Sequence, residues 1–282
     1  MGGLLLGDMP LTGVNLDAYC KRIGYTGPRT PTLSTLRELL RLHPAAIPYD
    51  ASDARLGVDI DLAPAAVDAK LISAGRGGYC FEQNTLLLRV VLALGFRAEP
   101  LSARSRWRRP LHEHVARTHM AVRVHIDEHD WLADVGFGSC MLSAPLDMGF
   151  AGPQETLHEP ARVVPFPGEL RIERLLGDEW QPLYDLSLAP LQPVDLLAAN
   201  WLISKHPASS FHHNLVVSRT RDEVRHVLVN TRLTTRRTGA EVEHRELDAA
   251  QLEHSLIEDF GLPIQEDLRF LLAELASRAK GP

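Results

Sequence analysis

The stretch Arg76-Gly77-Gly78-Tyr79-Cys80-Phe81-Glu82-Gln83-Asn84 decides how the first part of this chain folds and which chemistry it carries. It leads into apolar residues at helical spacing, with Gly95 as a stop: Leu86, Leu87, Val90, Val91 and Leu94. We therefore expect Cys80 near the N-terminus of a helix, where unpaired N–H groups and the helix dipole lower a thiol pKa from about 8.5. Most lone cysteines are small buried hydrophobes. The flanking glycines and charges favour a nucleophile instead.

The composition is that of a globular protein. The chain has 282 residues, of which 45% are hydrophobic and 23% charged, enough for two or three subdomains. Cys20, Cys80 and Cys140 are an odd number without a C-x-x-C pair, which predicts no disulfide framework and fits a reducing cytoplasm. Residues 1–7 are apolar but too few to span a membrane, so we expect a soluble protein. The net charge of −6 gives no general attraction to nucleic acid.

Hydrophobic periodicity divides the chain into three parts. The first is helical, with caps expected at Asn15 or Asp17 and at Thr32 or Ser34, and with the second helix stopped by Pro44. The middle part changes to strand periodicity and predicts a barrel or curved sheet. The last part mixes strands and helices from about residue 200. Besides the strands at 118–126 and 131–137, we expect strands at 162–164, 170–175, 180–188, 214–218, 224–233 and 241–247, and helices at 64–72, 249–260 and 264–279.

The strands at 118–126 and 131–137 predict a hairpin with a four-residue turn, and this hairpin supplies a base for the thiol. On a two-residue period, His119 and Arg123 share one face. If Ile126 pairs with Trp131, Asp134 lies on that face but opposite Arg123, roughly 13 Å along the strand from His119. An even slip or a bulge would keep the face and bring the two together. A Cys-His-Asp relay, with His119 as base and Asp134 fixing its tautomer, is thus allowed but not fixed.

Other interpretations of the polar segments stay open. A strand histidine is more often a satisfied or exposed residue than a catalyst, and Asp134 could accept local backbone hydrogen bonds. The histidines at 112–129 lack H-E-x-x-H spacing and a thiol pair, so we expect no metal. Gly136-Phe137-Gly138 alone does not predict a phosphate site. A basic patch surrounds Trp107, which we interpret as solvated surface, with an anion site for cofactor phosphates as the alternative: Arg104, Arg106, Arg108 and Arg109.

Three blocks together resemble the signature of the arylamine N-acetyltransferases: Arg76 to Asn84, Thr118-His119, and Asp134-Val135-Gly136-Phe137-Gly138. The segments at 19–25, 31–36 and 200–211 extend the resemblance over nearly the whole chain. It implies an α+β fold with a cysteine-protease-like catalytic core: a helical bundle at 1–95, a β-barrel at 96–199 and an α/β lid at 200–282. The implied triad is Cys80, His119 and Asp134, which favours a slip in the hairpin.

The resemblance also implies an activity. Cys80 would attack acetyl-CoA, and the acetyl-cysteine would pass its acyl group to the nitrogen of an arylamine or arylhydrazine with ping-pong kinetics. Gly136, Phe137, Gly138 and Ser139 are expected near the substrate or the pantetheine arm, with Phe137 as an aromatic wall. Acetyl-CoA is then the acyl-donor substrate, and the partners are small molecules, without metal, nucleic acid or membrane. We expect a cytoplasmic enzyme of xenobiotic metabolism.

Three alternatives remain at this point. An amide synthase of the same fold, closing a macrolactam from a polyketide thioester, would show the same triad. A Cys-His-Asp hydrolase would release the acyl group to water, and a non-catalytic binding module would not use Cys80 at all. Acyl-chain preference, acceptor amine and oligomeric state are not decided by the residues.

One segment departs from the family pattern. Where the family shows Phe-Glu-Asn-Leu after Ile-Pro, this chain has Tyr49-Asp50-Ala51-Ser52. In the family that glutamate partners the arginine of the cysteine block. Arg76 must therefore pair with Asp50, Asp53 or Glu82, since a buried guanidinium needs a carboxylate. We expect a structural adjustment in which Arg76 and Glu82 support the site.

Overall fold

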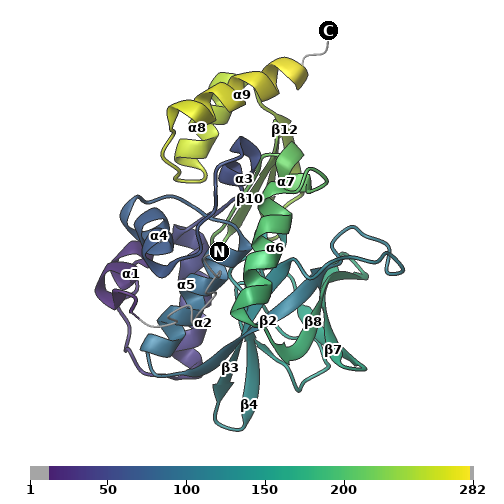
Figure 1. Cartoon of the computed structure of the whole chain (residues 1–282). Coiled ribbons are helices and arrows are strands. Elements are labelled where there is room, and N and C mark those ends of the chain that lie inside the picture. The colour runs from purple at the N-terminus through teal and green to yellow at the C-terminus, as the bar shows by residue number, and fades with distance from the viewer. Residues whose placement is uncertain (1–12, 280–282) are drawn as a thin grey trace, which may run out of the picture.

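The structure is a computed structural model that describes residues 13–279. Figure 1 shows three groups of elements: helices on one side, a curved sheet beside them, and a pair of helices at the far end. The main helices are α1 (Leu16–Ile23), α2 (Leu33–Ala46), α4 (Pro64–Asp68), α5 (Cys80–Ala93), α6 (Pro193–Lys205), α8 (Ala249–Glu258) and α9 (Glu266–Ala279). None of the described helices is long and apolar enough to cross a membrane. Residues 1–7, which we judged too short for a span, lie outside the described part.

The helical part begins and ends where the caps predict, with one exception. Asn15 Oδ1 accepts a hydrogen bond from the N–H of Ala18 at 3.0 Å, and Thr32 caps α2. The expected stop at Pro44 is wrong, because α2 continues to Ala46. Proline has a helical φ and removes a single i→i−4 bond, so the last turn survives it. The helix expected at 64–72 is divided into α4 and a π-helical turn, η1 (Ala69–Ser73).

Seven strands form the curved sheet, in the order β5-β4-β3-β2-β8-β7-β6. Their bounds are β2 (Arg97–Ser105), β3 (His119–Ile126), β4 (His129–Ala133), β5 (Leu146–Asp147), β6 (Ala161–Phe166), β7 (Glu169–Leu176) and β8 (Glu179–Pro190). Gln154 nearly closes the barrel. Its side chain bonds the backbone N–H and C=O of Asp147 on β5, while its own backbone pairs with Ala161 on β6. The expected strands at 162–188 are present, and β2 is a strand that the sequence did not predict.

The hairpin that carries His119 is tighter than expected. Ile126 pairs with His129, not with Trp131, so the expected four-residue turn is wrong and two residues, Asp127 and Glu128, connect the strands. The register therefore slips by two residues, an even number that keeps every side chain on its expected face. Extending the pairing of Val122 with Ala133 by one step sets Asp134 opposite residue 121. The chain leaves the strand at that point, since β4 ends at Ala133.

The last part contains a five-stranded sheet in the order β1-β9-β10-β11-β12. The bounds are β1 (Tyr49–Asp50), β9 (Val216–Thr220), β10 (Val224–Val229), β11 (Arg232–Arg237) and β12 (Glu243–Glu246). A single strand at 224–233 was expected and is wrong, because Asn230 adopts φ 55° and turns the chain between β10 and β11. Strand β1 comes from the helical part. It pairs with β9 and also bridges Gly78, so the cysteine block is tied to this sheet.

Three clusters of buried apolar side chains correspond to these groups of elements. The two faces of β3 divide between two of the clusters: Met120 and Val122 pack with the helices, whereas Ala121 packs inside the barrel. Helix α6 runs through residue 200, where the lid was expected to begin. The buried Leu196 of α6 packs with the helical core, whereas the core of the last part begins at Leu215. We propose that the three expected domains correspond to the three cores, with the core of the lid beginning after α6.

Candidate active site

The three residues expected to form the triad lie together and are buried. Cys80 is the first residue of α5, and its Sγ lies 3.7 Å from the carbonyl oxygen of Thr118, which directly precedes His119. His119 Nε2 lies 2.7 Å from Asp134 Oδ2. Cys80 and His119 are each 4% exposed and Asp134 is 1% exposed. Because Nε2 faces the carboxylate, Nδ1 is the ring nitrogen left for the thiol proton.

Asn84 holds Asp134 in place from the next turn of α5. Its Nδ2 donates to Asp134 Oδ1 at 2.9 Å and to the carbonyl of Met120 at 2.6 Å, while its Oδ1 accepts from the N–H of Val135 at 3.0 Å. The N–H of Gly136 adds a further bond to Asp134 Oδ1 at 2.8 Å. A single amide thus fixes the helix, the strand and the carboxylate relative to one another.

Gly136 lets this loop approach the nucleophile helix. A Cβ at this position would lie 2.6 Å from Asn84 Nδ2 and 2.9 Å from both the Cα and the carbonyl oxygen of Cys80. No real Cβ tolerates such contacts with backbone. The glycine is therefore required by the closeness of the Asp134 loop to α5.

The electrostatics of the thiol differ from the sequence-based expectation. Burial, followed by the nearby charge of Asp134, raises the pKa of Cys80, whereas the backbone N–H groups of Phe81 and Cys80 act in the opposite direction. The helix N-terminus was expected to lower this pKa, but desolvation outweighs it. Burial also opposes ionisation of Asp134, yet His119, Asn84 and the Gly136 N–H hold the pKa of this carboxyl below its ordinary value. Asp134 is therefore an anion beside the imidazole.

Aromatic rings pack around the imidazole. The His119 ring lies 4.9 Å from that of Phe137 and 5.0 Å from that of Tyr184, and the two aromatic rings are 4.8 Å apart. Phe137 therefore lies beside the base, and its role as an aromatic wall for a substrate ring stays a prediction. Tyr184, on β8, was not predicted, because a lone strand tyrosine carries no signal of its partners.

A cavity of about 1170 Å³ opens onto these residues. Cys80, His119 and all four residues from Gly136 to Ser139 line it. The barrel contributes arginines and the region after α6 contributes Phe211 of α7 (Ser210–His213). The basic patch is only partly a surface: Arg106 is 9% exposed and pairs with Asp185, so interpreting it as solvated surface is wrong for this residue.

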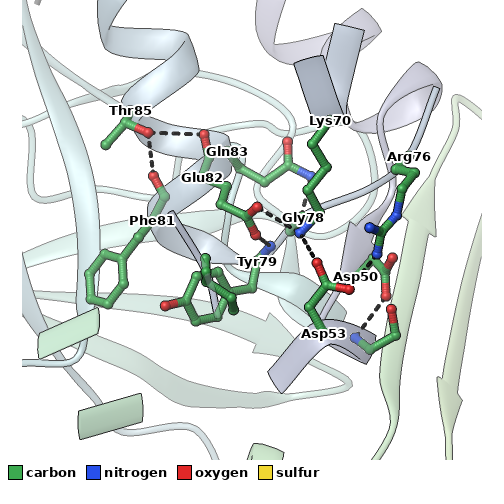
Figure 2. Close-up of polar contacts among 12 residues, drawn as sticks. Asp50, Asp53, Lys70, Arg76, Gly78, Tyr79, Phe81, Glu82, Gln83 and Thr85 are labelled. Carbon is green, nitrogen blue, oxygen red and sulfur yellow. Dashed lines mark hydrogen bonds and ion pairs between the residues drawn. The ribbon is translucent and has the colours of Figure 1, made fainter. Parts of the chain in front are cut away.

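A chain of ion pairs supports the start of α5 (Figure 2). Glu82 Oε2 accepts the N–H of Tyr79 at 3.0 Å, and its Oε1 lies 2.6 Å from Lys70 Nζ. Lys70 also lies 2.8 Å from Asp53, which in turn pairs with Arg76 at 2.5 Å. The negative charge of Glu82, which is 2% exposed, is thereby offset by Lys70, and the Tyr79 backbone is held at the start of the helix.

Asp53 is thus the partner of Arg76 among the three candidates. Asp50 Oδ1 instead accepts the N–H of Ser52, the first residue of α3 (Ser52–Leu56), at 2.9 Å. Although burial opposes both changes, the ion pairs hold the pKa of Asp53 below, and that of Lys70 above, their ordinary values. Lys70 was not predicted at all, and Asn84 was quoted without a role. Asn84 could have been found, because it lies one helical turn after Cys80 on the same face.

Comparison with known proteins agrees with this geometry. A family model described as N-acetyltransferase matches residues 32–269. The arylamine N-acetyltransferase of Mycolicibacterium smegmatis is 36% identical over 259 residues, which cover 89% of this chain and 93% of that protein. The chain belongs to the arylamine N-acetyltransferase family. The arylamine N-acetyltransferase of Escherichia coli is 33% identical over 264 residues, covering 93% of this chain and 94% of that protein.

Solved structures of arylamine N-acetyltransferases share the fold. The Mycobacterium marinum enzyme superposes with a TM-score of 0.89 at 33% identity and covers 93% of this chain and 100% of its own. A structure of the M. marinum enzyme in complex with CoA gives a TM-score of 0.88 at 34% identity, with 93% and 99% covered. The expected family and the expected α+β fold are confirmed, and the chain is an acyltransferase whose family membership supports acetyl transfer to arylamines.

Proposed function

We propose that this chain transfers an acetyl group from acetyl-CoA to the nitrogen of arylamines or arylhydrazines through an acetyl-Cys80 intermediate. One observation carries the proposal: a buried cysteine begins a helix on the wall of the cavity that His119 also lines, and His119 is held by Asp134. A nucleophile, a base and an orienting carboxylate around a substrate-sized cavity are the parts that covalent acyl transfer needs.

In the first half-reaction, Cys80 gives its proton to His119 Nδ1 while Sγ attacks the thioester carbonyl carbon. The bond from that carbon to the CoA sulfur then breaks, and the leaving thiolate takes the proton from the imidazolium. Burial raises the pKa of the thiol, so the free anion is disfavoured. The thiolate is instead stabilised as an ion pair with the imidazolium, and Asp134 balances that positive charge. One thioester replaces another, so this step is nearly isoenergetic.

In the second half-reaction, the acceptor nitrogen attacks the acetyl carbon. An arylamine is mostly neutral at pH 7 and attacks without first losing a proton. His119 removes the proton as the nitrogen–carbon bond forms and returns it to the departing Cys80 sulfur. We assign Phe137 to the aryl ring and Gly136, Gly138 and Ser139 to the approach, and their place on the cavity wall supports this assignment.

The cavity also suits a CoA thioester as donor. Its volume of about 1170 Å³ exceeds the roughly 300–1,000 Å³ of most small-molecule pockets, leaving room for both a pantetheine arm and an aryl group. The M. marinum structure in complex with CoA supports this donor. We place the activity in a reducing cytoplasm, where the free thiols of Cys20, Cys80 and Cys140 stay reduced.

Intact mass spectrometry tests the proposal. Incubation with acetyl-CoA should add the mass of one acetyl group, and a chase with 4-methylaniline should remove it and yield the amide. Cys80→Ala should abolish both events. Cys140→Ala, a matched control at a second buried cysteine, should preserve them. Acetylation that persists in Cys80→Ala contradicts the mechanism. Loss of the acetyl group at the same rate without amine would indicate a hydrolase.

A further inference from the structure

An arginine occupies an interior position of the barrel where an apolar side chain is expected. Along β7 the inward-facing residues alternate as Leu170, Ile172 and Arg174. The first two belong to the barrel core, and Arg174 continues their face at 1% exposure. Burying a guanidinium is costly unless it is fully paired. Its partners therefore decide what it does.

Arg174 shares the carboxylate of Glu159 with a second buried arginine. Arg225, also 1% exposed, donates from Nη1 to Glu159 Oε2 at 3.1 Å and from Nη2 to the carbonyl of Met141 at 3.2 Å. Arg174 Nη1 lies 3.2 Å from the same Glu159 oxygen without hydrogen-bond geometry. Within residues 13–279 neither guanidinium forms an ion pair with another carboxylate, and Arg174 Nε has no hydrogen-bond acceptor. Two buried cations thus face one anion.

The remaining neighbours do not supply the missing negative charge. The Arg174 guanidinium carbon lies 5.6 Å from the centre of the Trp107 ring, a contact that stabilises the flat face of the cation but not its N–H edge. Burial raises the pKa of Cys140, so its thiol stays neutral. Burial, then Arg225, lowers the pKa of His158, which is likewise neutral near pH 7. The cluster carries an excess positive charge.

This excess charge faces the substrate cavity. Arg174 lines the same cavity as Cys80, His119 and Phe137, and so does Trp107, on which Arg174 stacks. A guanidinium that is 2% exposed along its side chain suits a small planar carboxylate, which accepts two parallel N–H bonds. The phosphates of CoA are bulky and strongly hydrated, and they fit a surface site better than this one.

We propose that Arg174 is a specificity-determining residue that binds a carboxylate carried by the substrate in the Cys80 cavity. This inference rests on the proposed acetyl transfer. The carboxylate has two possible sources, an acceptor such as an aminobenzoate or an acyl donor such as malonyl-CoA. Either carboxylate would give Arg174 an anionic partner of its own, because Arg174 and Arg225 share Glu159. The neutral counterparts, 4-methylaniline and acetyl-CoA, would leave the guanidinium unpaired.

The test compares wild type with Arg174→Met and with a matched control, Arg162→Met. Like Arg174, Arg162 stacks on a tryptophan, with its guanidinium carbon 4.3 Å from the centre of the Trp180 ring, and pairs with a carboxylate, that of Glu173. Unlike Arg174, it does not line the cavity. One arm measures kcat/KM for 4-aminobenzoate relative to 4-methylaniline with acetyl-CoA. The other measures malonyl-CoA relative to acetyl-CoA with 4-methylaniline. Arg174→Met should lower the ratio in one arm about 10- to 100-fold, as expected for loss of a charged hydrogen bond, whereas Arg162→Met should leave both ratios unchanged.

A second readout does not depend on turnover. Benzoate should raise the melting temperature of wild type but not of Arg174→Met, while benzamide should raise neither.

Arg174→Met leaves one arginine for one glutamate, so we expect it to fold at least as stably as wild type. If Arg174→Met fails to fold, Arg174→Lys replaces it, since lysine keeps the charge and loses the planar guanidinium. Arg174→Lys should still lower the kcat/KM ratio in one of the two arms. Unchanged ratios and equal benzoate protection would overturn the assignment. A wild type that forms no acetyl-Cys80 would overturn the proposed function, and benzoate protection would still report on the Arg174 site.

Discussion

Lys70 is the residue whose removal tests the supporting network most directly. Its ammonium group lies 2.6 Å from Glu82 and 2.8 Å from Asp53, and the three side chains are 14%, 2% and 8% exposed. Lys70→Met keeps the length and apolar volume of the side chain but removes the charge. Among the described residues, the Glu82 side chain then keeps one hydrogen-bond partner, the N–H of Tyr79. Its carboxylate would be left buried without a counter-charge.

Breaking a buried ion pair by removing one partner costs about 3–5 kcal/mol, because the remaining charge stays desolvated. Whole proteins are stable by only about 5–15 kcal/mol. Burial already raises the pKa of Glu82 despite the opposing effect of Lys70. In Lys70→Met we therefore expect Glu82 to take up a proton near neutral pH. Asp53 is affected less, since it keeps Arg76 at 2.5 Å.

Urea unfolding followed by circular dichroism measures this cost. Lys70→Met should lose about 3–5 kcal/mol, and the double variant Lys70→Met/Glu82→Gln should recover more than half, because glutamine accepts the Tyr79 N–H without a charge. The control is Lys205→Met, whose partner Asp59 has a 93% exposed side chain. It should cost at most about 1 kcal/mol. A Lys70→Met cost as small as that of the control would refute the reasoning, as would a double variant no more stable than the single one.

Three further predictions concern the site and its surroundings. Gly136→Ala should abolish acetyl-Cys80 formation in intact mass spectra, since its Cβ would lie 2.9 Å from the Cys80 backbone; normal acetylation would contradict the close approach. Asn84→Ala removes a charged hydrogen bond from Asp134 and should slow acetylation about 10- to 100-fold in rapid-quench kinetics; an unchanged rate would exclude a positioning role. Burial lowers the pKa of His43 from 6.5 to about 4, so the unfolded chain binds the proton more tightly, and about 3 kcal/mol of stability should be lost as pH falls from 6.5 to 4. The loss should be absent in His43→Leu, and an equal loss there would assign it to other groups.

Local patterns predicted the parts of the site that local physics controls. Helical periodicity before Gly95 set Cys80 at the start of α5, where the structure has it. Strand periodicity put His119 and Asp134 on one face, and the even slip preserves that face. The size of the slip was not predictable, because the tight turn depends on Asp127 adopting φ 52°. Aspartate tolerates this conformation, but 127–128 lacks the glycine that usually announces a two-residue turn.

Partners distant in sequence could not be predicted in the same way. The choice of Asp53 over Asp50 for Arg76 depends on how α3 turns Asp53 toward the cysteine block, while Asp50 on β1 accepts the N–H of Ser52. Arg174 had a signal that the strand prediction did not use, namely a charge on the inward face of an otherwise apolar strand. Burying a charge on that face lowers the stability of the fold, which indicates a functional role for the residue.

The network behind Cys80 offers a substitute for the Glu-Asn pair that the family resemblance leads us to expect. Glu82 raises the pKa of the Cys80 thiol by its charge, in addition to burial and Asp134. Lys70 lies between Glu82 and Asp53 and offsets both carboxylates, so less of their negative field reaches the thiolate. In this arrangement Asp53 replaces the missing glutamate as partner of Arg76, and Lys70 keeps the additional buried carboxylate from opposing the nucleophile. If this is the role of Lys70, then Lys70→Met should slow acetylation more than Lys70→Met/Glu82→Gln does at alkaline pH, where Glu82 is ionised and only the single variant leaves a carboxylate two residues from Cys80 without its counter-charge.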